Sequence, residues 1–128
     1  MRLLLDSNIL IPMIDGSGRK LPAHIINVIT NPEADLFASV ASIWEVAIKH
    51  RLGKLALPCA LSEWPTALAN LNIRALRIVT AHVIKEIELW PETKDPFDRL
   101  LLAICDAERM SLITLDRELR DHPLAWRA

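Results

Sequence analysis

Four short runs of the chain are apolar nearly throughout and are bounded by polar or turn-forming residues. Such runs, without polar alternation, are typical of strands that are covered on both faces of a parallel sheet. We therefore predict strands over residues 2–5, 36–40, 73–79 and 112–115. Residues 124–126 add a candidate edge strand near the end of the sequence.

Between these runs, apolar residues recur at the three- and four-residue spacing of amphipathic helices. Helices are predicted over residues 8–14, 21–30, 42–52, 61–71, 80–87 and 95–109, with a helical turn over 116–120. Short strands that alternate with helices favour an α/β sandwich around a parallel sheet. No linker, repeat or low-complexity segment interrupts the pattern, so we expect one domain over residues 1–128.

Composition excludes several classes of protein. Apolar residues make up 52% of the 128, which is too many for a disordered chain. Fifteen Lys and Arg against sixteen Asp and Glu give a net charge of −1, so bulk positive charge cannot hold a nucleic acid. Cys59 and Cys105 are too few for a disulfide scaffold and are expected to be free thiols in a reducing compartment. No apolar run approaches the roughly 20 residues of a membrane helix, so we expect a cytoplasmic protein.

Four acidic residues fall where predicted strands lead into helices: Asp6, Glu45, Asp98 and Asp116. In open α/β sheets, sites form beyond the carboxyl ends of the strands, where such residues would gather. Converging carboxylates repel one another, and we see no lysine or arginine in the immediate turns of Asp6 or Glu45 to offset the repulsion. Mg²⁺ or Mn²⁺ would offset it, and a metal that activates water beside a phosphate hydrolyses phosphodiesters.

Each acid except Asp6 also has a purely structural interpretation. Ser42 and Glu45 have the spacing of a capping box, Asp95 suits the first position before a helix, and Asp98 would then complement the helix dipole. Asp116 can cap the turn that follows it. Asp6, directly after the most apolar strand, would be half-buried and would need a partner.

Four segments together resemble the PIN-domain ribonucleases, and among these the VapC-type toxins of toxin–antitoxin pairs. They are spread over nearly the whole chain in the family's order. The segments are Leu4-Leu5-Asp6-Ser7-Asn8; Ser42-Ile43-Trp44-Glu45 with Lys49 and Leu52-Gly53-Lys54-Leu55; Asp95-Pro96-Phe97-Asp98-Arg99-Leu100-Leu101; and Leu112-Ile113-Thr114-Leu115-Asp116.

The resemblance implies a three-layer sandwich around a short, mainly parallel sheet. It implies a Mg²⁺- or Mn²⁺-dependent endoribonuclease that is the toxin of a type II pair. In that family's terms all four acids are catalytic: Asp6, Glu45 and Asp98 are the core metal-binding acids, and Asp116 is the fourth, which closes the site or holds a second metal. The partners that it implies are RNA, a VapB-like antitoxin and a second copy of the chain.

The resemblance also implies supporting roles for Ser7, Asn8 and Thr114 around Asp6. The sequence departs from many relatives at two positions. Ser7 stands where they carry a threonine and keeps the hydroxyl, whereas Thr93 stands where close relatives carry a histidine, which puts substrate handling near that loop in question.

Basic residues lie near three of the acids. Contacts with RNA phosphates and a solvated helix face with surface ion pairs are both open interpretations for Lys49, Arg51, Arg99 and Arg117. The histidines at 24, 50, 82 and 122 lack metal-ligand spacing and are expected on the surface. The tryptophans at 44, 64, 90 and 126 are expected in the core.

Two other functions stay open. Asp6 could be the nucleophile of an α/β phosphotransfer or phosphatase-like protein, although Asn8 stands where haloacid-dehalogenase-like phosphatases carry a second aspartate. The chain could instead be a non-catalytic interaction module in which the acids only cap helices.

Overall fold

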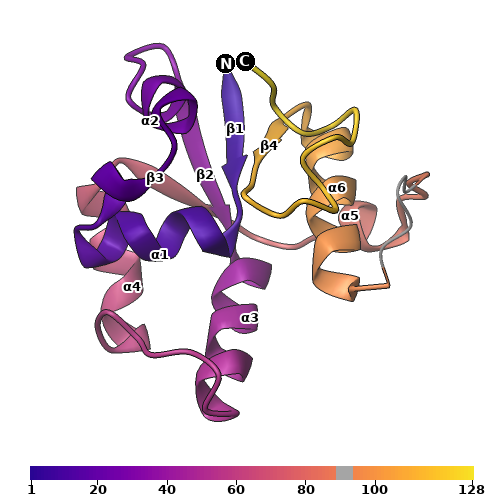
Figure 1. Ribbon diagram of the computed structural model, residues 1–128. Coiled ribbons are helices and arrows are strands. Elements are labelled where there is room, and N and C mark those ends of the chain that lie inside the picture. Colours follow the sequence, from indigo (N-terminus) through magenta and orange to yellow (C-terminus); the bar gives the residue numbers. More distant parts are fainter. Residues whose placement is uncertain (89–93) are drawn as a thin grey trace.

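A computed structural model of the protein shows a parallel sheet with the strand order β3-β2-β1-β4 (Figure 1). The structure describes residues 1–88 and 94–128. The strands are β1 (Arg2–Leu5), β2 (Asp35–Ser39), β3 (Ile73–Leu76) and β4 (Ser111–Ile113). The four predicted strands and their parallel arrangement are therefore confirmed. The edge strand predicted over 124–126 is reduced to an isolated bridge between Leu112 and Ala125.

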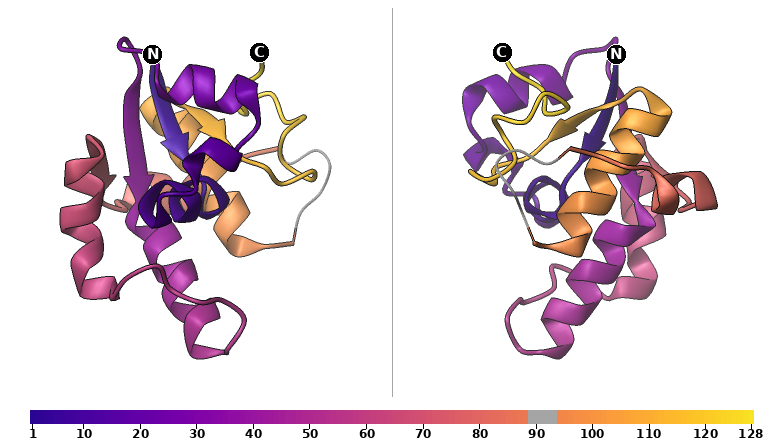
Figure 2. Two further views of the ribbon diagram at one scale, coloured as in Figure 1. Left: turned by 60° about the vertical axis from the view of Figure 1, so that its left-hand side comes forward. Right: turned by 90° about the vertical axis from the view of Figure 1, so that its right-hand side faces the viewer.

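Helices cover both faces of the sheet. They are α1 (Ser7–Asp15), α2 (Ala23–Ile29), α3 (Val40–Arg51), α4 (Trp64–Asn70), α5 (Thr80–Ile84) and α6 (Pro96–Glu108), with short 3-10 turns η1 (Gly18–Lys20) and η2 (Leu61–Glu63). Figures 1 and 2 show α1, α2 and α4 on one side of the sheet and α5 and α6 on the other, which confirms three layers. None of the helices in the described ranges is long and apolar enough to cross a membrane.

The first strand builds both halves of the core because its side chains alternate between the two faces. Leu3 and Leu5 are fully buried among the residues of α1, α2 and α4. Leu4 faces the other way and packs against α6. It lies in register with Phe37 of β2 and Leu112 of β4, which belong to the same cluster. Burial on both faces explains why the strand lacks polar alternation.

The predicted cap of one helix is wrong by a few residues. Helix α3 begins earlier than expected, because Ser39 is its N-cap and its hydroxyl accepts a hydrogen bond from the amide of Ala41 at 3.0 Å. Ser42 is therefore inside the helix and not the start of a capping box. Helix α5 has Val79 as its N-cap, so Thr80 is its first residue.

Two histidines expected on the surface are buried. His82 is 1% exposed, and its Nε2 lies 2.8 Å from Oε1 of Glu108 on α6. His122 is 4% exposed and donates from Nε2 to the carbonyl of Glu88 at 2.9 Å, while its Nδ1 accepts from the amide of Leu124. Both rings serve the fold by satisfying buried or half-buried polar groups, which a search for metal-ligand spacing does not detect.

The tryptophans differ in burial although all were expected in the core. Trp64 is fully buried and Trp126 is half-buried. Trp44 is 62% exposed, so its predicted place in the core is wrong. Trp90 and Thr93 lie outside the described residues.

Candidate active site

Asp6 lies at the point of the sheet where the strand order reverses, between β1 and β4. It follows β1 directly, caps α1, and is 4% exposed. Its Oδ1 accepts from the amide of Ser7 at 2.7 Å, and its Oδ2 accepts from the hydroxyl of Thr114 at 2.7 Å. Hydrogen bonds from both neighbouring elements therefore fix the position of this buried carboxylate.

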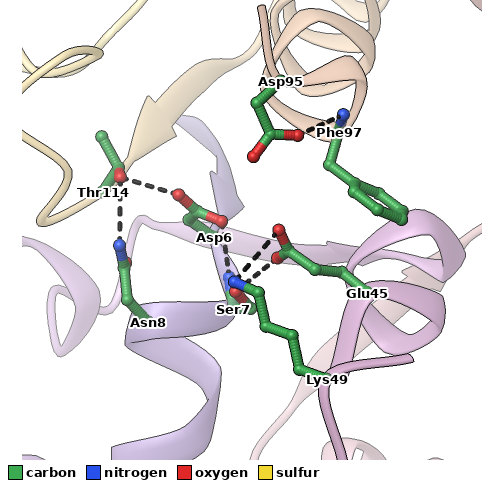
Figure 3. Close-up of polar contacts among 8 residues, drawn as sticks. All are labelled: Asp6, Ser7, Asn8, Glu45, Lys49, Asp95, Phe97 and Thr114. Carbon is green, nitrogen blue, oxygen red and sulfur yellow. Dashed lines mark hydrogen bonds and ion pairs between the residues drawn. The ribbon is translucent and has the colours of Figure 1, made fainter. Parts of the chain in front are cut away.

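Ser7 joins Asp6 to a second buried carboxylate. The Ser7 hydroxyl donates to Oε1 of Glu45 at 2.7 Å, and the Ser7 amide donates to Asp6. Glu45 is 6% exposed and comes from α3, the helix that follows β2. Figure 3 shows the two carboxylates on either side of this one serine. Acids that are 39 positions apart in the chain thus share a hydrogen-bonding partner.

Thr114 connects the exit of β4 to the start of α1. Its Oγ1 donates to Asp6 and accepts from the side-chain amide of Asn8 at 3.4 Å and from the backbone amide of Asp116 at 3.0 Å. Oδ1 of Asn8 accepts in turn from the amide of Leu115. Ser7 and Thr114 therefore contact Asp6 directly, and Asn8 reaches it only through Thr114, while their supporting role in a functional site stays a prediction.

Asp116 has the structural role that its position predicted. Its Oδ1 accepts from the amide of Glu118 at 2.9 Å and so caps the turn after β4. The carboxylate is also close enough to affect Asp6 electrostatically. The side chain of Asp116 therefore caps the turn and also lies close enough to Asp6 to affect its charge.

The charge balance at Asp6 disfavours its ionised form. Burial raises the pKa of Asp6 above its ordinary value, and the negative charges of Glu45 and Asp116 raise it further. The hydrogen bonds from Thr114 and Ser7 act in the opposite direction without outweighing burial. A cation bound beside Asp6 would stabilise its ionised form.

Lys49 already supplies one positive charge to this group. Its Nζ lies 3.4 Å from Oε2 of Glu45, one helical turn along α3 (Figure 3). The prediction that no lysine or arginine flanks Glu45 is therefore wrong. The spacing of four residues could have revealed the pair, because side chains four apart on a helix are neighbours.

The start of α6 contributes Asp95 and Asp98. Oδ1 of Asp95 accepts from the amide of Phe97 at 2.8 Å, which confirms the predicted N-cap. Asp98 is 6% exposed in the first turn of the helix. The ring of Phe97 packs edge-on against Trp44, with 5.4 Å between their centroids, and this contact joins the start of α6 to α3 one residue before Glu45.

The remaining basic residues are solvent-exposed. Arg51, Arg99 and Arg117 form no ion pair within residues 1–88 and 94–128. They are therefore accessible to a ligand, although their contact with RNA stays a prediction.

No group of three His, Cys, Asp or Glu side chains in the described part of the chain is arranged to hold a metal ion by itself. The contacts bring Asp6 and Glu45 together and place Asp116 within electrostatic reach of Asp6. The metal set of Asp6, Glu45, Asp98 and Asp116 stays a prediction.

Residues 3–123 match the PIN domain family. The chain belongs to that family. Family membership confirms the resemblance found in the sequence and implies a nuclease, which is a hydrolase. Among curated proteins, the comparison found no match to this sequence.

Two solved structures share the fold of this PIN domain. One is VapBC2 from Rickettsia felis bound to a DNA fragment from their promoter, with a TM-score of 0.62 and 14% identity over 98% of this chain and 96% of that one. The other is a toxin–antitoxin complex from Klebsiella pneumoniae, with a TM-score of 0.59 and 19% identity over the same shares.

Proposed function

We propose that this PIN domain is a metal-dependent endoribonuclease and the toxin of a toxin–antitoxin pair. The observation that supports the chemistry is the pair of buried carboxylates, Asp6 and Glu45, held by Ser7 at the carboxyl edge of the sheet. Burying two acids together is costly, and such groups cluster at functional sites, where a bound cation would offset their charge.

The side chains at this place fit Mg²⁺ or Mn²⁺. The donors are carboxylate oxygens, which these hard cations prefer, and Mg²⁺ is commonly held by one or two carboxylates and several waters. Asp6 and Glu45 would hold the ion, with Asp98 and Asp116 as the further acids. When bound, the ion would lower the pKa of a water and neutralise charge on the scissile phosphate.

The other residues position the two acids. Thr114 and Ser7 each donate to one oxygen of Asp6, which leaves lone pairs on both oxygens for a cation. Arg51, Arg99 and Arg117 are exposed and would meet the RNA backbone. A chain with a net charge of −1 could bind RNA in this way. Several of its acids would gather around a cation that offsets their charge, and its exposed arginines would remain available to the phosphates.

Two observations support the proposal of an antitoxin partner and of a homodimer. They are the nature of solved structures with the same fold and the exposed apolar surface of this chain. One solved structure of the same fold is a toxin–antitoxin complex, and another is VapBC2 bound to a DNA fragment from its promoter. Helix α5 and its cap expose Val79, Val83 and Ile84 by 48%, 65% and 71%. Side chains of this type suit an interface with a VapB-like antitoxin or a second copy.

Cleavage of a single-stranded RNA pool with added Mg²⁺ or Mn²⁺ tests the activity. We expect Asp6→Asn and Glu45→Gln to lower kcat/KM by more than about a hundredfold, since even supporting residues of metal sites cost about 10- to 100-fold. Glu63→Gln removes an exposed acid far from the site in the chain and should cleave like the wild type.

An RNA pool left intact by the wild-type protein with either ion would contradict the nuclease. Cleavage that persists in both acid variants would point to a contaminating enzyme. A stable adduct with beryllofluoride at Asp6, without cleavage of RNA, would favour the phosphotransfer alternative.

A further inference from the structure

Lys49 occupies the oxygen of Glu45 that Ser7 leaves available. Ser7 donates to Oε1 of Glu45, whereas Nζ of Lys49 lies 3.4 Å from Oε2. The two partners approach the same carboxylate from different elements, α1 and α3 (Figure 3). Both oxygens of Glu45 therefore have a partner within the chain itself.

Within residues 1–88 and 94–128, Lys49 is the one basic residue that pairs with either Asp6 or Glu45. The partners of Asp6 are the hydroxyl of Thr114 and the amide of Ser7, which carry no net charge. Without Lys49, the repulsion between the two buried acids would have no opposite charge in contact to offset it among the described residues.

The two members of the ion pair differ in solvent exposure. The side chain of Glu45 is 7% exposed, whereas that of Lys49 is 50% exposed. The lysine end of the pair is half-exposed and lies on a flexible four-carbon chain, so water can replace Glu45 around the ammonium when Lys49 leaves the contact. The contact between Lys49 and Glu45 therefore offsets the charge of Glu45, and Lys49 can still give way to another cation.

We propose that Lys49 is the built-in counter-ion of this site, which stabilises the metal-free protein and competes with the divalent cation for Glu45. The inference rests on the proposed function, because it takes the metal-binding role of Glu45 from there. In this role Lys49 acts on Glu45 and the cation, and it does not need to contact RNA. Binding of the cation would release Lys49 from Oε2.

Titration with Mn²⁺ alone, followed by calorimetry and by thermal unfolding, tests this competition without RNA. We expect Lys49→Met to bind Mn²⁺ about three- to fivefold more tightly than the wild type, the factor that corresponds to an ion pair of up to about 1 kcal/mol. Its metal-free Tm should be lower and its gain in Tm with Mn²⁺ larger. Lys49→Arg keeps the charge and should resemble the wild type.

Lys54→Met is the matched control. It removes the same charge from an exposed residue just beyond α3 that has no ion pair in the described residues, so it reports the effect of net charge alone. Potassium chloride at about 1 M should reduce the difference between Lys49→Met and the wild type, since salt screens exposed pairs.

The outcomes separate this inference from the proposed function. Equal or weaker Mn²⁺ affinity in Lys49→Met, with normal affinity in the wild type, overturns the competition and leaves the metal site intact. Absence of Mn²⁺ binding from all variants overturns both. If Lys49→Met is unfolded at the assay temperature, Lys49→Gln replaces it, and the same direction of change is required.

Discussion

At the scale of single residues, the site depends on hydroxyl groups as much as on acids. Ser7 and Thr114 each donate to a buried carboxylate oxygen at 2.7 Å. A hydroxyl can donate to one partner while it accepts from others, and Thr114 does so with Asn8 and Asp116. A side chain of the same shape without oxygen would leave several polar groups unsatisfied.

Thr114→Val tests this role of the hydroxyl. The variant loses a hydrogen bond that lowers the pKa of Asp6, so we expect that pKa to rise further above its ordinary value. We also expect a loss of about 1–3 kcal/mol in the free energy of unfolding, because partners of the hydroxyl become unsatisfied. An NMR titration of the Asp6 carboxyl carbon and urea unfolding measure the two effects.

Thr114→Ser is the control for that experiment, since it restores the hydroxyl in a smaller side chain. It should recover the wild-type pKa of Asp6. A pKa of Asp6 that is unchanged in Thr114→Val would show that the hydrogen bond has no influence on the acid.

The role of a single residue can be predicted from the sequence when a signal for it lies nearby in the chain, and not when it depends on a distant partner. Asp6 could be identified because a carboxylate directly after an apolar strand needs a partner. The pair of Lys49 and Glu45 also had a local signal, its spacing of four residues, that was missed. The burial of His122 had none, because its partner Glu88 is 34 residues away.

At the scale of elements, the strands were easier to predict than the helix ends. Strands β1 and β2 are buried on both faces, so their apolar runs define them. The spacing of Ser42 and Glu45 favoured a helix that begins at Ser42, whereas the N-cap of α3 is Ser39, which lies in the range predicted as a strand. Tertiary structure decided between them, because Glu45 turns inward to Ser7 instead of back to the helix end.

A pair of alanine substitutions separates the two possible caps. Ser39→Ala should lower the free energy of unfolding by about 1 kcal/mol, the usual cost of removing an N-cap. Ser42→Ala should be neutral or stabilising, since the Ser42 hydroxyl is buried without a hydrogen-bonding partner in the described part of the chain. Urea unfolding of both variants measures the difference, and the opposite ranking would restore the capping box at Ser42.

At the scale of the whole molecule, the parallel sheet brings distant segments to one edge. Asp6 follows β1, Glu45 lies on the helix after β2, and Thr114 and Asp116 follow β4. Because all strands run the same way, their carboxyl ends meet. The alternation of strands and helices predicted this gathering. It could not predict which side chains would touch, because those contacts depend on register.

The stability of the whole protein should carry the signature of Asp6 in its dependence on pH. Burial raises the pKa of Asp6, so the folded protein holds this proton more tightly than the unfolded chain. The contribution of Asp6 to stability is therefore greatest below its ordinary pKa of 3.8 and decreases as the pH rises from there through the raised pKa. Above the raised pKa, the ionised carboxylate of Asp6 lowers the free energy of unfolding by an amount that no longer changes with pH.

Asp6→Asn isolates this contribution because asparagine does not titrate. We expect the free energy of unfolding of Asp6→Asn, minus that of the metal-free wild type, to increase with pH across this window and then to level off. Urea unfolding at a series of pH values gives the curve, and Asp121→Asn, which removes an exposed aspartate, gives the reference. A difference that decreases with rising pH would mean that Asp6 is stabilised as an anion even without a metal. In that case the hydrogen bonds from Ser7 and Thr114 would outweigh burial, and the fold would have no need of a cation at this place.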